Sequence, residues 1–535
     1  MMKRWIAVFL TLLMLSGCAP KEETPAASQQ PTSPAQVQQE SAYESRFSSE
    51  TLIELSDNGI RTEALSVFVS TDIIYYEDKD FYESGNPYGE GEDADKHTAD
   101  EAAAHTVVNI TKPGAYRVTG KLSAGQIRVD LGEEAYEDPN AVVELILDNA
   151  DITCTVAPAI LFLNVYECDG DRSEDTAKPD VDTSAAGANL ILEGENTVNG
   201  SYVARIYKDK EGEKKLWKQD GAIYSYMSMN VSGSGALELN AENEGMDTEL
   251  HLTINGGDIT ILSGNDGINT NEDGVSVTTI NGGKLHIVAG LGAEGDGIDS
   301  NGYLVINGGT VISAAKPAAD AGLDSDLGSY IHGGTVVALG SSMDWAESDS
   351  KQVTMNLQFS QHQRGAIRIL RDDGTEVFSF DPASDAVLST HERTYQGVIL
   401  SCPEFNIGDS YEVFIGDTRM MYTGTDVMMR PGGFGHGFGG KMPDNAPPEG
   451  FNAERPEMPE GWTPGEMEQP PEGQTPTWPE GARPEMPDGQ KNGDRGGPGG
   501  FHGGFSDVAQ PDEGNAVFYM QDKVNFFSGL TALTE

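Results

Sequence analysis

Ile254-Asn255-Gly256-Gly257 is the first of four similar phrases that decide the fold of this chain. The others follow at steps of 26, 26 and 25 residues: Ile280-Asn281-Gly282-Gly283, Ile306-Asn307-Gly308-Gly309 and Ile331-His332-Gly333-Gly334. A period of this length, with strand-like residues on both sides, is typical of a solenoid whose coils stack on one another. An amphipathic helix is excluded, because the apolar residues do not recur at intervals of three and four residues. We therefore predict an all-β protein, a parallel β-helix.

Each Gly-Gly pair precedes a strand in which apolar and polar residues alternate, as in Asp258-Ile259-Thr260-Ile261. Alternation places one residue of each coil on the inner face, in the order Ile259, Leu285, Val311, Val336. The preceding residues face outward: Asp258, Lys284, Thr310 and Thr335. The glycines suit a sharp corner that needs a positive φ angle.

A second repeated phrase contains the acidic residues. It occurs as Glu244-Gly245-Met246-Asp247, Asp266-Gly267-Ile268-Asn269, Asp296-Gly297-Ile298-Asp299 and, less regularly, Gly322-Leu323-Asp324, with a weaker copy at Asp220-Gly221-Ala222-Ile223. Coils in register would give one column of Asp247, Asn269, Asp299 and Asp324. A second column would hold Glu244, Asp266 and Asp296, with Asp320 as a candidate fourth member. Like charges on rungs about 4.8 Å apart repel one another, so the columns favour a bound cation.

The oxygen-only donors of these columns favour Ca²⁺ over zinc or copper. The loop from Asn269 to Gly274 resembles the start of an EF-hand loop, but Ile280 stands where that motif needs a glutamate, which excludes a true EF-hand. The alternative is that the acidic residues only make turns at solenoid corners. The predicted calcium ligands are Glu244, Asp247, Asp266, Asn269, Asn271, Asp273, Asp296, Asp299, Asp320, Asp324 and Asp326.

The order of these phrases resembles a family of secreted, calcium-loaded carbohydrate-binding proteins of cellulolytic clostridia. The segments Ile110–Gly120, Gly125–Asp130, Leu145–Ile152 and Tyr395-Gln396-Gly397-Val398 also match its pattern, so the likeness covers roughly residues 70 to 425. The resemblance implies a right-handed parallel β-helix, calcium at the acidic corners, no catalytic residues, and binding of cellulose or pectin-type polygalacturonate.

The N-terminus is typical of a secreted lipoprotein. Lys3 and Arg4 precede an apolar run from Trp5 to Leu15, and Leu15-Ser16-Gly17-Cys18 matches a lipobox. We predict a signal peptide at residues 1–17, a lipid on Cys18 and a flexible tether at 18–48, which would anchor the protein outside the cytoplasm at the cell surface. A signal peptide with an incidental cysteine is the alternative.

The net charge of −52 argues against nucleic-acid binding, which needs a basic face. It also argues against direct capture of an acidic glycan without bridging cations. The cysteines other than Cys18 are too few for a disulfide scaffold. A Cys154–Cys168 bridge and buried free thiols are both compatible with the sequence.

One basic insert interrupts this acidic chain between Arg205 and Lys218. Its Lys214, Lys215 and Trp217 suit an anionic sugar by charge and by ring stacking, and suit a solvated loop equally well.

The remaining boundaries follow from composition. We predict the β-helix at 49–345, a small C-terminal β cap at 346–428 and a disordered loop rich in Pro-Glu-Gly units at 429–512. The apolar end at 513–535 is predicted to return to the cap.

Three functions are compatible with these features. The first is a non-catalytic, calcium-dependent lipoprotein that binds polysaccharide at the cell surface. The second is a pectate-lyase-like enzyme, in which Lys284 or Lys316 would remove a proton beside a calcium-bound uronate. The third is a structural or adhesive surface protein. Fold alone does not choose among them.

Overall fold

The computed structural model describes residues 43–75, 97–170, 173–207, 216–317, 320–341, 345–425 and 514–533. Apart from the short helix α1 (Ala99–Ala103) and the 3-10 turns η3 (Glu133–Glu137) and η4 (Leu388–Thr390), the regular elements are strands. The prediction of an all-β chain is confirmed. None of the helices in this part of the chain has the length and apolar character needed to cross a membrane. The predicted signal peptide, most of the tether and the whole of the Pro-Glu-Gly tract lie outside the described residues.

Strands from successive coils pair in parallel and form three stacks, which we number first to third. The first stack begins with an antiparallel pair and continues in parallel. Its members are β2 (Val67–Ser70), β3 (Thr106–Ile110), β5 (Gly125–Asp130), β7 (Ile160–Asn164), β12 (Gly221–Ser225), β15 (Glu244–Thr248), β18 (Ile268–Thr270) and β21 (Ile298–Ser300).

The second and third stacks belong to one larger sheet. The second stack consists of β1 (Glu50–Leu55), β4 (Gly114–Leu122), β6 (Val143–Cys154), β8 (Ala188–Glu193), β13 (Met229–Gly233), β16 (Leu252–Ile254), β19 (Val277–Ile280), β22 (Tyr303–Ile306) and β24 (Gly328–Ile331). The third stack starts on the end of β6 and continues with β9 (Glu195–Gly200), β14 (Ala236–Ala241), β17 (Asp258–Ser263), β20 (Lys284–Val288), β23 (Thr310–Ala314) and β25 (Thr335–Gly340).

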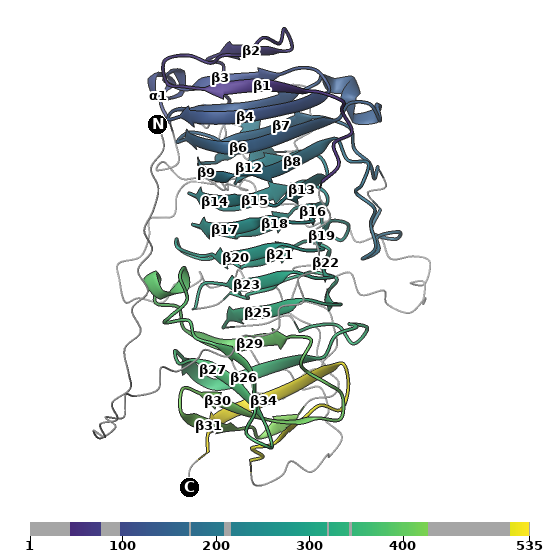
Figure 1. Cartoon of the computed structure of the whole chain (residues 1–535), viewed down its shortest axis with the longest axis vertical. Coiled ribbons are helices and arrows are strands. Elements are labelled where there is room, and N and C mark those ends of the chain that lie inside the picture. The colour runs from purple at the N-terminus through teal and green to yellow at the C-terminus, as the bar shows by residue number, and fades with distance from the viewer. Residues whose placement is uncertain are drawn as a thin grey trace, which may run out of the picture. The chain divides into compact units, whose positions relative to one another are not determined.

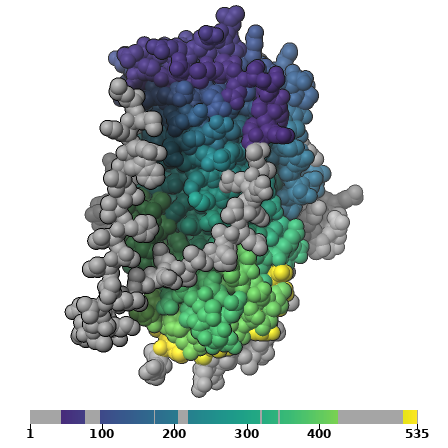
Figure 2. Space-filling view, in the orientation of Figure 1, coloured from purple at the N-terminus to yellow at the C-terminus, as the bar shows by residue number. Residues whose placement is uncertain are grey.

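From β12 to β23 the chain visits the first, second and third stack in turn and then repeats the circuit one rung further along (Figure 1). The surface view shows the same order as bands of colour from purple through teal to green (Figure 2). A pair of strands outside the stacks, β10 (Val203–Tyr207) and β11 (Leu216–Gln219), flanks the basic insert.

The register of the third stack follows the sequence period. Ile259 pairs with Leu285, Leu285 with Val311, and Val311 with Val336. All four side chains are buried, while Asp258 and Lys284 at the preceding position are exposed. The predicted alternation of inner and outer residues is therefore confirmed.

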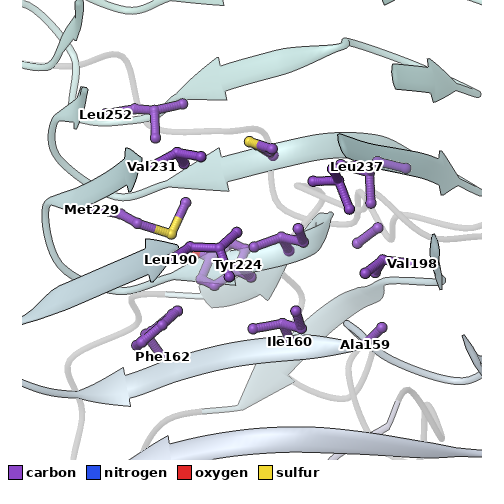
Figure 3. Packing of buried hydrophobic residues seen from close by; sticks show 14 of the residues in the cluster. Ala159, Ile160, Phe162, Leu190, Val198, Tyr224, Met229, Val231, Leu237 and Leu252 are labelled. Atoms are coloured by element: carbon purple, nitrogen blue, oxygen red, sulfur yellow. The ribbon is translucent and has the colours of Figure 1, made fainter. Parts of the chain in front are cut away.

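The inner faces of the three stacks enclose one long apolar core. Figure 3 shows part of it, where Phe162 and Tyr224 of the first stack meet Leu190 and Val231 of the second and Leu237 of the third. Burying a side chain of this size contributes about 1.5–3 kcal/mol relative to exposure. The repeating core is therefore what selects the stacked arrangement.

The corners between the second and third stacks contain the Gly-Gly pairs. Gly283 has a φ of 81°, and a Cβ on it would lie 2.6 Å from the carbonyl oxygen of Gly257 on the coil before. Only glycine tolerates both constraints. Beside this corner the side chain of Asn307 donates to Asn281, and that of Asn281 donates to Asn255, each over 2.9 Å.

After β25 the pairing becomes mostly antiparallel, around a second apolar core. The strands are β26 (Thr354–Gln363), β27 (Ile367–Arg371), β28 (Glu376–Phe380), β29 (Tyr395–Ser401), β30 (Ser410–Ile415), β31 (Thr418–Met421), β32 (Gly424–Thr425), β33 (Phe518–Tyr519) and β34 (Val524–Ala532). The end of the chain joins this region, because β33 pairs with β30 and β34 pairs with β26.

The cysteines of the described part, Cys154, Cys168 and Cys402, are free thiols. A disulfide between Cys154 and Cys168, which the sequence left open, is not formed here.

Candidate metal centre at the acidic columns

The first acidic column lies on the first stack. Asp247 of β15 pairs with Asn269 of β18, which pairs with Asp299 of β21. The next coil continues the column, because the amide of Ser300 donates to the carbonyl of Asp324 over 3.2 Å. The predicted alignment of these four residues is confirmed, and its cause is the register imposed by the buried Met246, Ile268 and Ile298 beside them.

The second column departs from the prediction at its last member. The amide of Gly245 donates to Asp266 and that of Gly267 to Asp296, but the amide of Gly297 donates to Ala321. Asp320 therefore precedes the expected position by one residue, because Gly322 must align with Gly297, where backbone and core approach closely. The Asp320 carboxylate instead accepts a hydrogen bond of 2.9 Å from the amide of Gly295.

The other predicted ligands lie in the turns that follow the first stack. Asn271 donates to the Asp247 carboxylate over 2.7 Å, which ties this turn to the first column. Asp273 accepts from the side chain of Asn301 over 3.1 Å, and both Asp273 and Asp326 are exposed. The side-chain exposure of the predicted ligands thus increases along the columns, from fully buried near β15 to solvent-accessible near Asp326.

The strongest convergence of carboxylates involves Asp220, Glu244 and Asp247. One carboxylate oxygen of each lies within 4.8 Å of the others, and the three residues are 6%, 2% and 0% exposed. Asp220 belongs to the weaker copy of the acidic phrase and was not among the predicted ligands. The Asp220-Gly221 pair, which matches the start of the phrase in the later coils, could have indicated it. The structure also brings Lys218 of the basic insert to this place, with its ammonium 2.6 Å from Asp220.

Three buried oxygens of this centre have no hydrogen-bond partner: Oε2 of Glu244, Oδ2 of Asp247 and Oδ1 of Asn269. The side-chain amide of Asn269 donates to the other Glu244 oxygen over 3.3 Å, so Asn269 and Glu244 are neighbours. A buried polar group without a partner costs about 1–3 kcal/mol, and more when it is charged. An arrangement of several such acceptors needs protons or a cation to compensate it.

The electrostatics of the columns lead to the same requirement. Burial, and then the neighbouring carboxylates, raise the pKa values of Glu244, Asp247 and Asp266 well above the ordinary range. Burial and the charge of Asp324 raise the pKa of Asp296 to about 8 and that of Asp299 to about 7. The charge of Lys218 opposes the rise in the pKa values of Glu244, Asp247 and Asp299 only in part. A divalent cation would favour the ionised forms.

The donor set fits calcium. The unpartnered atoms are carboxylate and amide oxygens, the two columns contain neither histidine nor cysteine, and the neighbouring residues offer further oxygens. Calcium accepts six to eight such ligands with flexible geometry, whereas zinc prefers nitrogen and sulfur. The residues that would hold an ion most closely are Asp220, Glu244, Asp247 and Asn269.

The residues predicted to bind sugar, carry the lipid or act in a lyase either lie away from this centre or fall outside the described residues. Lys214, Lys215 and the side chain of Trp217 are outside the described residues, and so is Cys18. The lyase candidate Lys284 is on the third stack, 2.8 Å from the Asp258 carboxylate. Lys316 is nearer the acidic columns, but its ammonium donates to the carbonyl of Gly292.

Comparison with known proteins gives three findings. A family model described as a carbohydrate-binding domain-containing protein matches residues 104–397, more than half of the 535 residues. A carbohydrate-binding domain-containing protein of Acetivibrio thermocellus is 32% identical over 174 residues, which are 32% of this chain and 51% of that protein. The chain therefore spans about half the length of this curated relative.

The third finding is a solved structure, a gadolinium derivative of the polysaccharide lyase-like protein from C. thermocellum. The likeness has a TM-score of 0.31 and 22% sequence identity, and it covers 54% of this chain and 93% of that chain.

Proposed function

The chain belongs to the family of carbohydrate-binding domain-containing proteins, and on that premise we propose that it is a non-catalytic, calcium-dependent polysaccharide-binding lipoprotein of the cell surface. The observation that carries the calcium dependence is the set of unpartnered, buried oxygens on Glu244, Asp247 and Asn269. A carbohydrate-binding domain implies a polysaccharide partner. We propose plant-type or acidic polysaccharide, either polygalacturonate or cellulose.

We infer that the three stacks form a right-handed parallel β-helix. The support is the repeated circuit through the first, second and third stack, with parallel pairing at each return. Connections between parallel strands are right-handed in nearly all proteins, because a right-twisted strand packs back onto its sheet only that way.

Calcium would play two roles along the columns. At Asp220, Glu244 and Asp247, where the carboxylates are buried, an ion would be enclosed by the protein and would serve stability. Towards Asp299, Asp324 and Asp326 the carboxylates become solvent-accessible. An ion held there would keep coordination sites for a ligand oxygen, since calcium tolerates mixed and irregular ligand sets.

This arrangement gives a mechanism for binding an acidic polysaccharide to an acidic protein. Without cations, each uronate would be repelled by the columns, at about 1 kcal/mol per pair of charges at 4 Å in water. A shared calcium ion reverses the sign of that interaction. We therefore expect polygalacturonate to be depleted from solution by the protein in calcium and to remain in solution in chelator.

Polymer depletion, together with ultraviolet absorbance measured on the same mixtures, separates the three functions that the sequence allows. A lyase would generate an unsaturated product, seen as rising ultraviolet absorbance of polygalacturonate in calcium; we expect no rise. A purely structural protein would deplete no polymer in either buffer. Depletion that is equal in calcium and in chelator would contradict calcium bridging.

We further propose that a lipid on Cys18 anchors the protein to the membrane, as the lipobox at Leu15-Ser16-Gly17-Cys18 suggests. Cys18→Ala should then move nearly all of the protein from the membrane fraction to the soluble or secreted fraction. Ala19→Ser, next to the modified position, is the matched control and should stay membrane-bound. Retention of Cys18→Ala on membranes washed in high salt would show that another attachment exists.

A further inference from the structure

A groove of about 430 Å³ lies on the outer face of the third stack, away from the acidic columns. Its floor is formed by outward residues of β9, β14 and β17, and its wall by the segment from Ala386 to His391, around η4. In Figure 1 this green segment lies beside β20 and β23, at the left of the stack.

The wall is fixed by its own contacts. Leu388 is 1% exposed and packs in the second apolar core. The Asp385 carboxylate accepts hydrogen bonds of 2.9 Å from the amides of Val387 and Leu388, and lies 3.0 Å from the imidazole Nε2 of His286 on β20. The groove is therefore formed in advance, which lowers the entropic cost of binding.

The lining has the chemistry of a site for hydroxyl-rich ligands. Hydroxyls come from Thr197, Thr260 and Thr390, and each of the three floor strands contributes one carboxylate, at Glu195, Glu238 and Asp258. Carboxylates accept hydrogen bonds from sugar hydroxyls, and the aliphatic side chains of Leu262 and Val387 offer apolar contact for ring faces.

The charge of the lining selects against an anionic ligand. Neither lysine nor arginine is among the lining residues, and burial together with the charge of Arg393 lowers the pKa of the lining residue His391. A uronate in the groove would meet three carboxylates, of which Asp258 is paired with Lys284, a residue outside the lining. The groove carboxylates also do not converge as a metal-binding group, since the described residues give one such group, at Asp220, Glu244 and Asp247.

We propose that this groove is a second carbohydrate subsite, which takes an uncharged stretch of polysaccharide and needs no calcium. The proposal rests on the proposed carbohydrate-binding function, and it adds a ligand class that the acidic columns do not serve. Three neighbouring strands span about 10 Å, which gives room for a short run of sugar units lying across the rungs.

The experiment uses the full chain, with hydroxyethylcellulose and galactomannan as uncharged probes and polygalacturonate as the acidic one, in affinity gels with calcium or with chelator. Thr260→Trp fills the groove from an outward position. Thr310→Trp is the matched control, because Thr310 is an outward residue of the same stack and does not line the groove. Circular dichroism checks folding, and Thr197→Trp replaces Thr260→Trp if the latter does not fold.

We expect the wild type to bind at least one uncharged probe equally in calcium and in chelator. Thr260→Trp should weaken that binding by about tenfold or more and leave calcium-dependent retention of polygalacturonate unchanged. Unaltered binding of the uncharged probes by the groove variant, or their release by chelator, would overturn the subsite. If polygalacturonate alone fails to bind, the acidic-column mechanism is wrong and the groove stands; if only polygalacturonate binds, the reverse holds.

Discussion

Chelation of calcium is expected to lower the thermal unfolding midpoint of the protein by roughly 5 °C for each site that is emptied. A ligand that binds only the folded state stabilises it by about 2.7 kcal/mol when its free concentration is about a hundred times the dissociation constant. For a domain of this size, 1 kcal/mol corresponds to roughly 2 °C. The measurement is calorimetric unfolding in excess calcium and in chelator, at one scan rate.

The pH dependence of this difference provides an internal control. The pKa of Asp296 is about 8 in the folded chain without metal, against an ordinary value of 3.8, so the folded state retains a proton that the unfolded chain has released. In chelator, the free energy of unfolding should therefore fall as pH rises between these two values. Calcium competes with protons, so its stabilisation should grow over the same range.

The gap between the midpoints in calcium and in chelator should consequently be small near pH 5 and widest at pH 8 and above. Magnesium at the same concentration serves as a further control, because it demands a more regular shell of ligands and should stabilise less. Equal midpoints in calcium and chelator at pH 8 would refute calcium binding by the columns.

The fold was predictable because its signal is repeated. Each inner residue of the third stack, such as Ile259 or Leu285, has a counterpart one period away, so the sequence states the same register several times. Glycine at the corner positions adds a backbone constraint that few other arrangements would explain. Periodicity and corner chemistry agree, and this consistency makes a sequence specify one structure.

The acidic columns were predictable for the same reason, but their ends were not. Asp320 lies one residue before the position predicted for it, beside Asp296, because the loop before Gly322 breaks the spacing and the alignment is decided by close packing at Gly297. Asp220 was missed as a ligand because its coil has Tyr224 where the later coils have Asp or Asn. Local sequence cannot reveal that its carboxylate turns towards Glu244.

Contacts between segments that are distant in the sequence could not be predicted from the repeats. Lys218 ends the basic insert, yet its charge meets the acidic centre through the pairing of β10 with β11. The groove depends on the segment around Leu388 folding back on the third stack, far from it in sequence. Such contacts depend on how irregular connections pack, and no period in the sequence records that.

We expect the double variant Glu244→Gln with Asp247→Asn to be more stable than the wild type in chelator and less stable than the wild type in excess calcium. Both substitutions keep the size of the side chain and remove a buried negative charge. In chelator the variant should unfold at a higher temperature than the wild type, because two adjacent, desolvated carboxylates no longer have to be protonated or tolerate mutual repulsion. In excess calcium the wild type should be the more stable protein.

The inversion follows from what each state requires. Amide oxygens can ligate calcium, but affinity depends on the number of charged ligands, so the double variant should bind calcium about tenfold more weakly or worse. Glu134→Gln with Asp417→Asn is the matched control, since it removes the same two charges from exposed positions. That control should keep the wild-type response to calcium.

If the Glu244 and Asp247 variant also kept the wild-type response to calcium, the ion would have to be held elsewhere along the columns, at Asp296, Asp299 and Asp324. A variant less stable than the wild type in chelator would mean that the buried carboxylates are stabilising in their own right, and the need for a cation at this centre would disappear.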